Sequence, residues 1–217
     1  MRPAAASAVL GLALAVGAPT AWALTRPDAA AGIPVEQALP APAAPAGAGD
    51  LPPLPTVTAR DAAPAVAVAA PAPARISVPA WGVDAPVDDV GIADDGQMEL
   101  PEDVSRVGWY RFGATPGADG SAVLAGHVDD REQGPGALFP LEDAAVGDEV
   151  TVTDASGAAT RWRVVSREVI TKQALPLDRL FARDGAPRLT LITCGGPFLP
   201  EFRSYRDNVV VVAEPIP

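Results

Sequence analysis

Apolar and polar residues alternate in short runs over residues 75–217. Val, Ile, Leu and Thr recur at every second position or in continuous apolar runs, which is typical of strands buried on one or both faces. Gly-containing turn signals separate these runs, and residues 136–143 and 177–183 are candidate short helices. The pattern therefore predicts an all-β domain, either a closed barrel or a sandwich. The predicted strands cover residues 75–78, 83–87, 121–128, 149–153, 162–170, 188–193 and 208–213.

Residues 1–75 lack this pattern and contain 27 Ala and 13 Pro. A segment of this composition buries too little apolar surface to offset the entropy lost on ordering, and proline favours extended polyproline II. We therefore predict a disordered Ala/Pro-rich linker over residues 26–74, followed by one folded domain over residues 75–217.

The first 25 residues have the character of an export segment. Residues 3–25 carry no charge and lie between Arg2 and Arg26. They fit a cleaved signal peptide with a small-residue site at Ala21-Trp22-Ala23, or an uncleaved apolar helix that anchors the chain in a membrane. A long spacer makes more sense on an anchored protein, so we favour the anchor. Both alternatives predict an exported domain, and the favoured anchor places it on the extracellular face of the cytoplasmic membrane.

Charge and composition narrow the function classes. Asp and Glu outnumber Lys and Arg by 27 to 16, for a net charge of −11. A nucleic-acid partner is therefore disfavoured, because binding phosphates requires an excess of cations. One Cys and one His in the whole chain exclude an internal disulfide and a zinc site of Cys and His ligands.

The single His and the single Cys each follow an apolar strand. His127 comes after Ala125-Gly126, Cys194 precedes two glycines, and Arg206 opens the last strand twelve residues later. An imidazole stabilises a thiolate and then protonates a leaving amine, while an arginine donates hydrogen bonds to a carbonyl or oxyanion. Together the three residues predict acyl transfer through a thioester.

Each of these residues also has an ordinary structural interpretation. A lone Cys is often a small buried hydrophobe, a lone His a surface residue, and an Arg beside an Asp a solvated pair. The residues alone leave both interpretations open.

Three motifs resemble those of the sortase family, and the resemblance covers about residues 75–214. Segments 75–87, 107–110 and 120–124 resemble the actinobacterial class F of that family. Papain-like enzymes are disfavoured because their Cys precedes their His, and L,D-transpeptidases because their Ser-His-Gly run is missing. The motifs are Ala125-Gly126-His127-Val128-Asp129, Leu191-Ile192-Thr193-Cys194-Gly195-Gly196 and Tyr205-Arg206-Asp207-Asn208-Val209-Val210-Val211.

The resemblance implies an eight-stranded closed sortase-type β-barrel and a cysteine transpeptidase that needs no metal or organic cofactor. By motif position, Cys194 matches the nucleophile, His127 the general acid and Arg206 the oxyanion or substrate-positioning residue. The substrates would be secreted proteins bearing a C-terminal, LPXTG-like sorting signal that is cleaved between Thr and Gly. The acceptor would be an amine on a peptidoglycan precursor or a pilin lysine.

Further residues of the implied site follow from the same motifs. Thr193, Gly195 and Gly196 match substrate-binding positions, and the implied peptide groove lies between residues 171–184 and 195–205. The first of these segments lacks an acidic calcium cluster, so no calcium dependence is expected.

Four alternatives stay open. Arg203 competes with Arg206 for the arginine role, and Asp129 either orients His127 or only solvates a turn. The same site could act chiefly as a hydrolase, with water in place of the amine. Finally, the domain could be a catalytically silent, tethered peptide-binding module.

Overall fold

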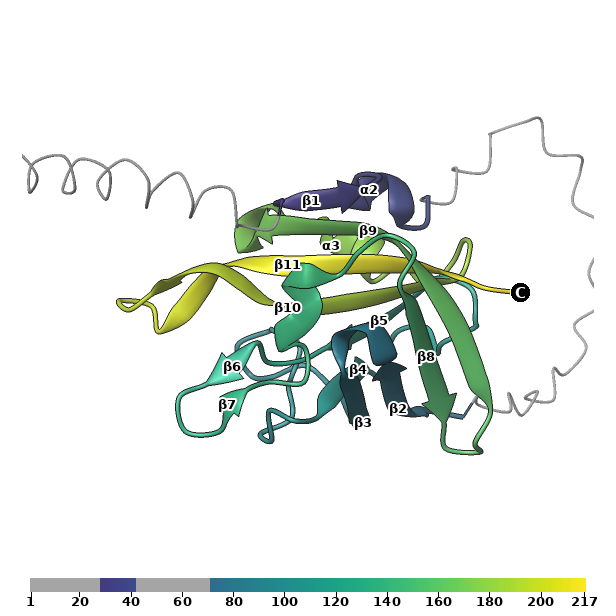
Figure 1. Ribbon diagram of the computed structural model, residues 1–217, viewed down its shortest axis with the longest axis horizontal. Coiled ribbons are helices and arrows are strands. Elements are labelled where there is room, and N and C mark those ends of the chain that lie inside the picture. The colour runs from purple at the N-terminus through teal and green to yellow at the C-terminus, as the bar shows by residue number, and fades with distance from the viewer. Residues whose placement is uncertain (1–27, 42–70) are drawn as a thin grey trace, which may run out of the picture.

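The computed structural model describes residues 28–41 and 71–217, which form strands joined by turns and very short helices (Figure 1). In chain order, with η for a 3-10 helix, the elements are β1 (Ala30–Gly32), α2 (Val35–Ala38), β2 (Pro73–Val78), η1 (Pro79–Trp81), β3 (Val83–Val90), β4 (Val107–Tyr110), β5 (Ser121–Ala125), β6 (Asp129–Asp130), β7 (Gly134–Pro135), η2 (Phe139–Asp143), β8 (Glu149–Asp154), β9 (Ala159–Thr171), η3 (Lys172–Ala174), α3 (Leu177–Leu180), β10 (Arg188–Leu199) and β11 (Ser204–Pro215).

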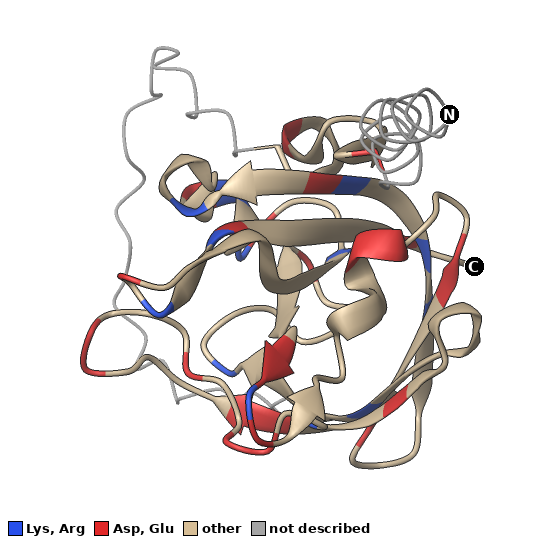
Figure 2. Cartoon of the chain, turned by 60° about the vertical axis from the view of Figure 1, so that its left-hand side comes forward, with Lys and Arg blue, Asp and Glu red and all other residues tan. Residues whose placement is uncertain are grey.

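Eight strands close into a barrel. Their order is β9-β11-β10-β5-β4-β3-β2-β8, and β8 pairs back onto β9. Figure 2 shows the strands closing into a ring. Two neighbouring pairs, β10 with β5 and β3 with β4, are parallel, and the others are antiparallel. The predicted all-β closed barrel with a few short helices is confirmed.

Strand alternation explains why β11 is apolar at five consecutive positions, residues 209–213. Val209 and Val211 point into the barrel and pack in the cluster that contains Trp162. Val210 and Val212 belong to a second cluster on the outer face, which residues of α2 and α3 cover. The site described below lies where this outer cluster meets the ends of β5 and β10.

The prediction of a disordered linker is wrong for residues 28–41. β1 pairs antiparallel with β9 through Ala30↔Glu168 and Gly32↔Ser166, beyond the stretch of β9 that pairs with β8. Strand pairing uses backbone groups and needs no apolar side chain, so a small Ala-rich segment can extend a free sheet edge. The Ala-rich composition of the segment therefore does not indicate that it can pair as a strand.

α2 completes the attachment of this segment by burying apolar side chains. Val35 and Ala38 are fully buried and Leu39 is 2% exposed. Two arginines then bind carbonyl oxygens at the end of the helix: Arg188 donates to Ala38 O and Arg179 to Leu39 O. Residues 28–41 are therefore part of the folded domain.

The remaining N-terminal predictions fall outside the described residues. These are the signal peptide or anchor over residues 1–25 and the linker over residues 42–70. Within residues 28–41 and 71–217, no helix is long and apolar enough to cross a membrane.

The structure also changes several strand boundaries. The sequence does not predict β4 as a strand, and β5 ends at Ala125 rather than at residue 128. β10 and β11 continue beyond their predicted ends into a hairpin, because a register shift between Gly195 and Phe198 lets pairing resume at Phe198↔Tyr205. The predicted helices become the shorter η2 and α3.

Candidate active site

Three neighbouring strands bring the candidate catalytic residues to one level of the sheet. β10 pairs with β5 up to Ile192↔Ala125, so two further residues along each parallel strand reach Cys194 and His127. On the other side of β10, Cys194 pairs with Asn208. Arg206 is two residues from Asn208 and therefore has the same side-chain direction along β11.

Thr193 ties the Cys194 strand to the His127 segment. Its hydroxyl donates to Gly126 O at 2.8 Å, and the Gly126 amide donates to Ile192 O at 3.1 Å. Thr193 is only 2% exposed. Its side chain is thus used inside the protein, and its contribution to the site is to fix the two segments against each other.

The His127 ring and backbone are held by two further loops. Nε2 lies 3.2 Å from Pro101 O. A carbonyl oxygen accepts hydrogen bonds and cannot donate, so Nε2 is the donor in this contact. Gly136 passes so close that a Cβ there would be 2.2 Å from His127 O, which excludes any larger residue.

Cys194 is a partly buried free thiol. Burial raises its pKa, and the charge of Asp129 acts in the same direction. The positive charge and hydrogen bond of Lys172 lower the pKa and oppose burial. The charges of Lys172 and Asp129 thus act on the thiol in opposite directions.

Asp129 is engaged by Tyr205. The Tyr205 hydroxyl donates to Asp129 Oδ2 at 2.7 Å, and this bond, followed by burial, raises the pKa of Tyr205 to about 12. Tyr205 is therefore protonated at neutral pH. The suggestion that Asp129 orients His127 is not what the structure contains: Asp129 accepts from Tyr205, and His127 contacts Pro101 O.

Arg206 is paired with its neighbour Asp207. Nε and Nη2 donate to the two carboxylate oxygens, each at 2.8 Å. The Asp207 side chain is 4% exposed and that of Arg206 54%. The guanidinium lowers the pKa of Asp207. Arg206 is thus held by a buried carboxylate, with its own side chain open to solvent.

The two glycines after Cys194 make room for β11. A Cβ on Gly195 would lie 2.7 Å from Val209 Cγ2. Gly196 has φ +70°, and a Cβ there would be 2.1 Å from Asp207 Oδ2. Both positions are thus required by packing, whatever their part in binding a peptide.

Arg203 lies farther from Cys194 along the hairpin than Arg206. It precedes Ser204, which pairs with Leu199 near the turn, and its φ is +47°. Between the two arginines, strand position favours Arg206.

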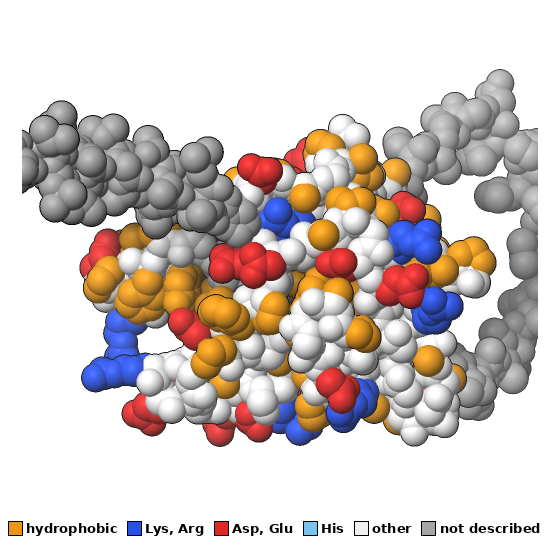
Figure 3. Space-filling view, in the orientation of Figure 1, with side chains coloured by type: hydrophobic (Ala, Val, Ile, Leu, Met, Phe, Trp, Pro, Cys, Tyr) orange, Lys and Arg blue, Asp and Glu red, His pale blue; other side chains and the backbone are white. Residues whose placement is uncertain are grey.

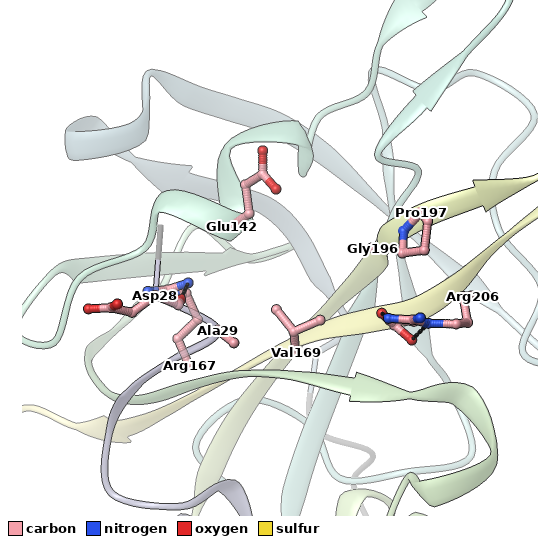
Figure 4. Close-up of a pocket in the computed structure, with 9 residues that line it drawn as sticks. Asp28, Ala29, Glu142, Arg167, Val169, Gly196, Pro197 and Arg206 are labelled. Carbon is pink, nitrogen blue, oxygen red and sulfur yellow. Dashed lines mark hydrogen bonds and ion pairs between the residues drawn. The ribbon is translucent and has the colours of Figure 1, made fainter. Parts of the chain in front are cut away.

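A cavity of about 610 Å³ lies next to the Cys194 strand (Figure 4). Gly196 and Pro197 form one side of it, the Arg206 side chain points into it, and Asp207 also lines it. Asp28, Glu142 and other residues complete the wall. The folded N-terminal segment thus contributes to a hollow that opens beside the candidate site.

The two segments expected to flank a peptide groove differ from simple loops. Residues 171–184 contain η3 and α3, while residues 195–205 are mostly the projecting hairpin of β10 and β11. Hydrophobic side chains gather over this hairpin in Figure 3, where Phe198 and Phe202 are 50% and 72% exposed. Phe198 also packs edge-on against Tyr205, with ring centroids 5.3 Å apart. No group of three metal-ligating side chains occurs in residues 28–41 and 71–217.

Sequence reasoning overlooks Lys172, and it treats Arg206 and Asp207 only as a solvated pair, whereas Asp207 is buried. Lys172 lies 22 positions before Cys194, in a segment assigned to the implied peptide groove without a role for this residue. Its one available signal is that it is the only lysine in the chain.

Known proteins give a family match and a set of structural likenesses. The family model described as "Sortase domain" matches residues 76–216. No curated protein matches the chain.

Three solved structures illustrate the structural likeness. Sortase A from Corynebacterium diphtheriae is 22% identical with a TM-score of 0.50, over 68% of this chain and 61% of that one. Sortase C-1 from Actinomyces oris is 22% identical with a TM-score of 0.53, over 66% of this chain and 73% of that one. Sortase C1 from Streptococcus suis is 18% identical with a TM-score of 0.53, over 67% of this chain and 73% of that one. At these identities the likeness shows a shared fold.

Proposed function

This chain belongs to the sortase family, and from that membership we propose that it is a class F cysteine transpeptidase of the cell envelope. It cleaves an LPXTG-like sorting signal between Thr and Gly and transfers the acyl group to an amine. The observation that carries the proposal is the strand register, which brings Cys194 of β10, Arg206 of β11 and His127, two residues beyond β5, to neighbouring positions.

In the first half-reaction, the Cys194 thiolate attacks the carbonyl carbon of the signal's Thr. Arg206 donates hydrogen bonds to the oxyanion as it develops. For this it turns from Asp207 toward the substrate, which its exposed side chain permits. The C–N bond then breaks, His127 gives a proton to the leaving Gly amine, and the acyl group stays on Cys194 as a thioester.

The second half-reaction reverses these roles. The acceptor amine attacks the thioester, loses a proton to His127, and expels the Cys194 sulfur as the new amide forms. Secreted proteins with a C-terminal sorting signal would be the acyl donors. The amine of a peptidoglycan precursor or a pilin lysine would be the acceptor.

The outer apolar cluster offers a surface for the peptide. Ile192 comes two residues before Cys194 on the same face of β10. Leu100, Ile170 and Leu175 pack against this cluster and are only partly buried. Apolar side chains of the signal would bind there, with the backbone of Gly195 close to the scissile bond.

For location, we propose the extracellular face of the cytoplasmic membrane, with residues 1–25 as the anchor. The charge-free stretch 3–25 supports this. Only Arg26 and Pro27 separate that stretch from Asp28, whose carbonyl accepts from Arg167 Nη1 at 2.8 Å. The barrel would therefore sit close to the bilayer instead of at the end of a long spacer. Extraction of cell membranes with alkaline carbonate tests this: an anchored chain stays in the pellet.

The catalytic proposal is tested with the full-length chain and a panel of fluorogenic sorting peptides. We expect cleavage between Thr and Gly, and a transpeptidation product when triglycine or a lysine peptide is added. Cys194→Ala is expected to remove both products while the barrel keeps its circular dichroism spectrum. Hydrolysis that is indifferent to added amine would favour the hydrolase alternative, and turnover by Cys194→Ala would refute the assignment of the nucleophile.

A further inference from the structure

The only lysine of the chain lies beside its only cysteine. The sequence contains 15 arginines and one lysine, Lys172. Lys172 begins η3, directly after Thr171 at the end of β9. Thr171 pairs with Asp207 of β11, and the next β11 residue, Asn208, pairs with Cys194. The fold thus places Lys172 and Cys194 at adjacent levels of the sheet, on either side of β11.

The Lys172 ammonium is held in place at this position. Nζ donates to Ser204 Oγ at 2.7 Å. The ammonium is also close enough to the Cys194 thiol for its positive charge to lower the thiol pKa. An ammonium has three donors in a compact head, so it can serve a hydroxyl and a sulfur at once.

Charged and titratable groups lie on every element around Cys194. His127 follows β5, Asp129 is in β6, Lys172 is in η3, and Tyr205 and Arg206 are in β11. Tyr205 is neutral and Asp129 is its acceptor. The Arg206 guanidinium is engaged with a carboxylate. The cation that interacts with the thiol in this structure is therefore Lys172.

We propose that Lys172 is a positioning residue that pairs with the Cys194 thiolate. This inference rests on the proposed role of Cys194 as nucleophile. On ionisation the S–H bond breaks and the proton passes to His127 or to water, while Lys172 keeps all of its protons. The ion pair holds the sulfur near β11 and favours the reactive anion over the neutral thiol.

The test is the pH dependence of Cys194 alkylation by iodoacetamide, an uncharged probe that reads the thiolate without any peptide. Full-length Lys172→Gln is compared with the wild type, with Lys172→Arg, and with Arg163→Gln. Arg163 is exposed, near Glu149 at the other end of β9, so its loss changes the net charge equally without touching the site.

In Lys172→Gln we expect the midpoint of the profile to rise by about one pH unit, so that alkylation at pH 7 slows about tenfold. Lys172→Arg should recover most of the rate, and Arg163→Gln should match the wild type. An unchanged profile in Lys172→Gln, or an equal shift in Arg163→Gln, would overturn the proposal.

Chemical modification of the folded wild type tests the same proposal if Lys172→Gln does not fold. In the folded wild type, Cys194 is first protected as a mixed disulfide, the amines are acetylated, and the thiol is then released. Loss of the Lys172 charge should produce the same shift, and an unshifted profile would contradict the proposal. Because alkylation needs no substrate, a chain that cleaves no peptide but shows the shift would refute the proposed function and leave the Lys172–Cys194 pairing in place.

Discussion

The two strands that flank Cys194 hold their candidate catalytic residues in different ways. On the β5 side, His127 follows a fully buried strand and is fixed by Thr193, by Pro101 O and by the close approach of Gly136. On the β11 side, the register shifts and the exposed Arg206 side chain is held by one buried carboxylate.

This difference fits the different roles proposed for His127 and Arg206. An imidazole that transfers a proton must keep a fixed distance from the sulfur and from the leaving amine. Rigid surroundings ensure this. An arginine that meets an oxyanion only when substrate is bound can start from another partner, provided that it can turn. The following variants test this contrast, from the largest expected effect to the smallest.

Removing the two side chains themselves gives the largest effect. His127→Ala should lower kcat by about 10²- to 10⁴-fold, because proton transfer to the leaving amine is lost. Arg206→Ala should lower it by about 10²- to 10³-fold through weaker oxyanion stabilisation. Steady-state peptide cleavage measures both. An Arg206→Ala variant with wild-type kcat would show that β11 does not supply the catalytic cation.

On the rigid side, Gly136→Ala should damage both stability and activity. The new Cβ would clash with His127 O, at a cost of about 1–3 kcal/mol in unfolding free energy. Displacement of His127 should lower kcat about tenfold or more. Gly113→Ala is the matched control, since its Cβ meets the side of the Tyr110 ring at 3.1 Å, away from His127. Thermal unfolding and cleavage assays should separate the two variants.

On the adjustable side, Gly196→Ala should displace Asp207 and with it Arg206. Its cost combines the positive φ of +70° with a clash against Asp207 Oδ2. Gly157→Ala isolates the first contribution, because Gly157 has φ +88° and nothing within 4 Å. We expect Gly196→Ala to lose about tenfold in kcat and Gly157→Ala to lose none. Equal activity in the two would contradict the positioning of Arg206 through Asp207.

The smallest effect concerns the pH dependence of stability. Arg206 lowers the folded-state pKa of Asp207, so the pair stabilises the domain above the unfolded-state pKa, and this contribution disappears as pH falls through the folded value. Asp207→Asn should therefore be less stable at pH 7, by less than about 1 kcal/mol because Arg206 is exposed. The difference from wild type should shrink toward pH 3. Urea unfolding at several pH values checks this, and a constant difference would point to packing.

Much of the barrel could be predicted from sequence because its strands alternate around buried Val, Ile and Leu. The strand ends that carry His127, Cys194 and Arg206 followed from the same runs. β4 did not, because its four residues are too short to show a period, and Gly108 interrupts them.

Other features depend on contacts that local patterns do not encode. β1 is Ala-Ala-Gly, and its pairing with β9 uses backbone groups that every residue has. Lys172 meets Cys194 only because β9, β11 and β10 are neighbours in the sheet. The Arg206–Asp207 pair could be suspected from adjacency, but the burial of Asp207 and the room that Gly196 leaves for it come from the tertiary structure.

The most direct test of the account is intact-mass analysis of the full-length chain mixed with an LPXTG-like peptide and no amine. We predict an acyl adduct that maps to Cys194, is released by hydroxylamine as a thioester must be, and disappears when triglycine is added. A chain that cleaves the peptide while its mass stays unchanged at every time point, or an adduct mapped to another residue, would contradict the assignment of Cys194 as the acyl-carrying nucleophile.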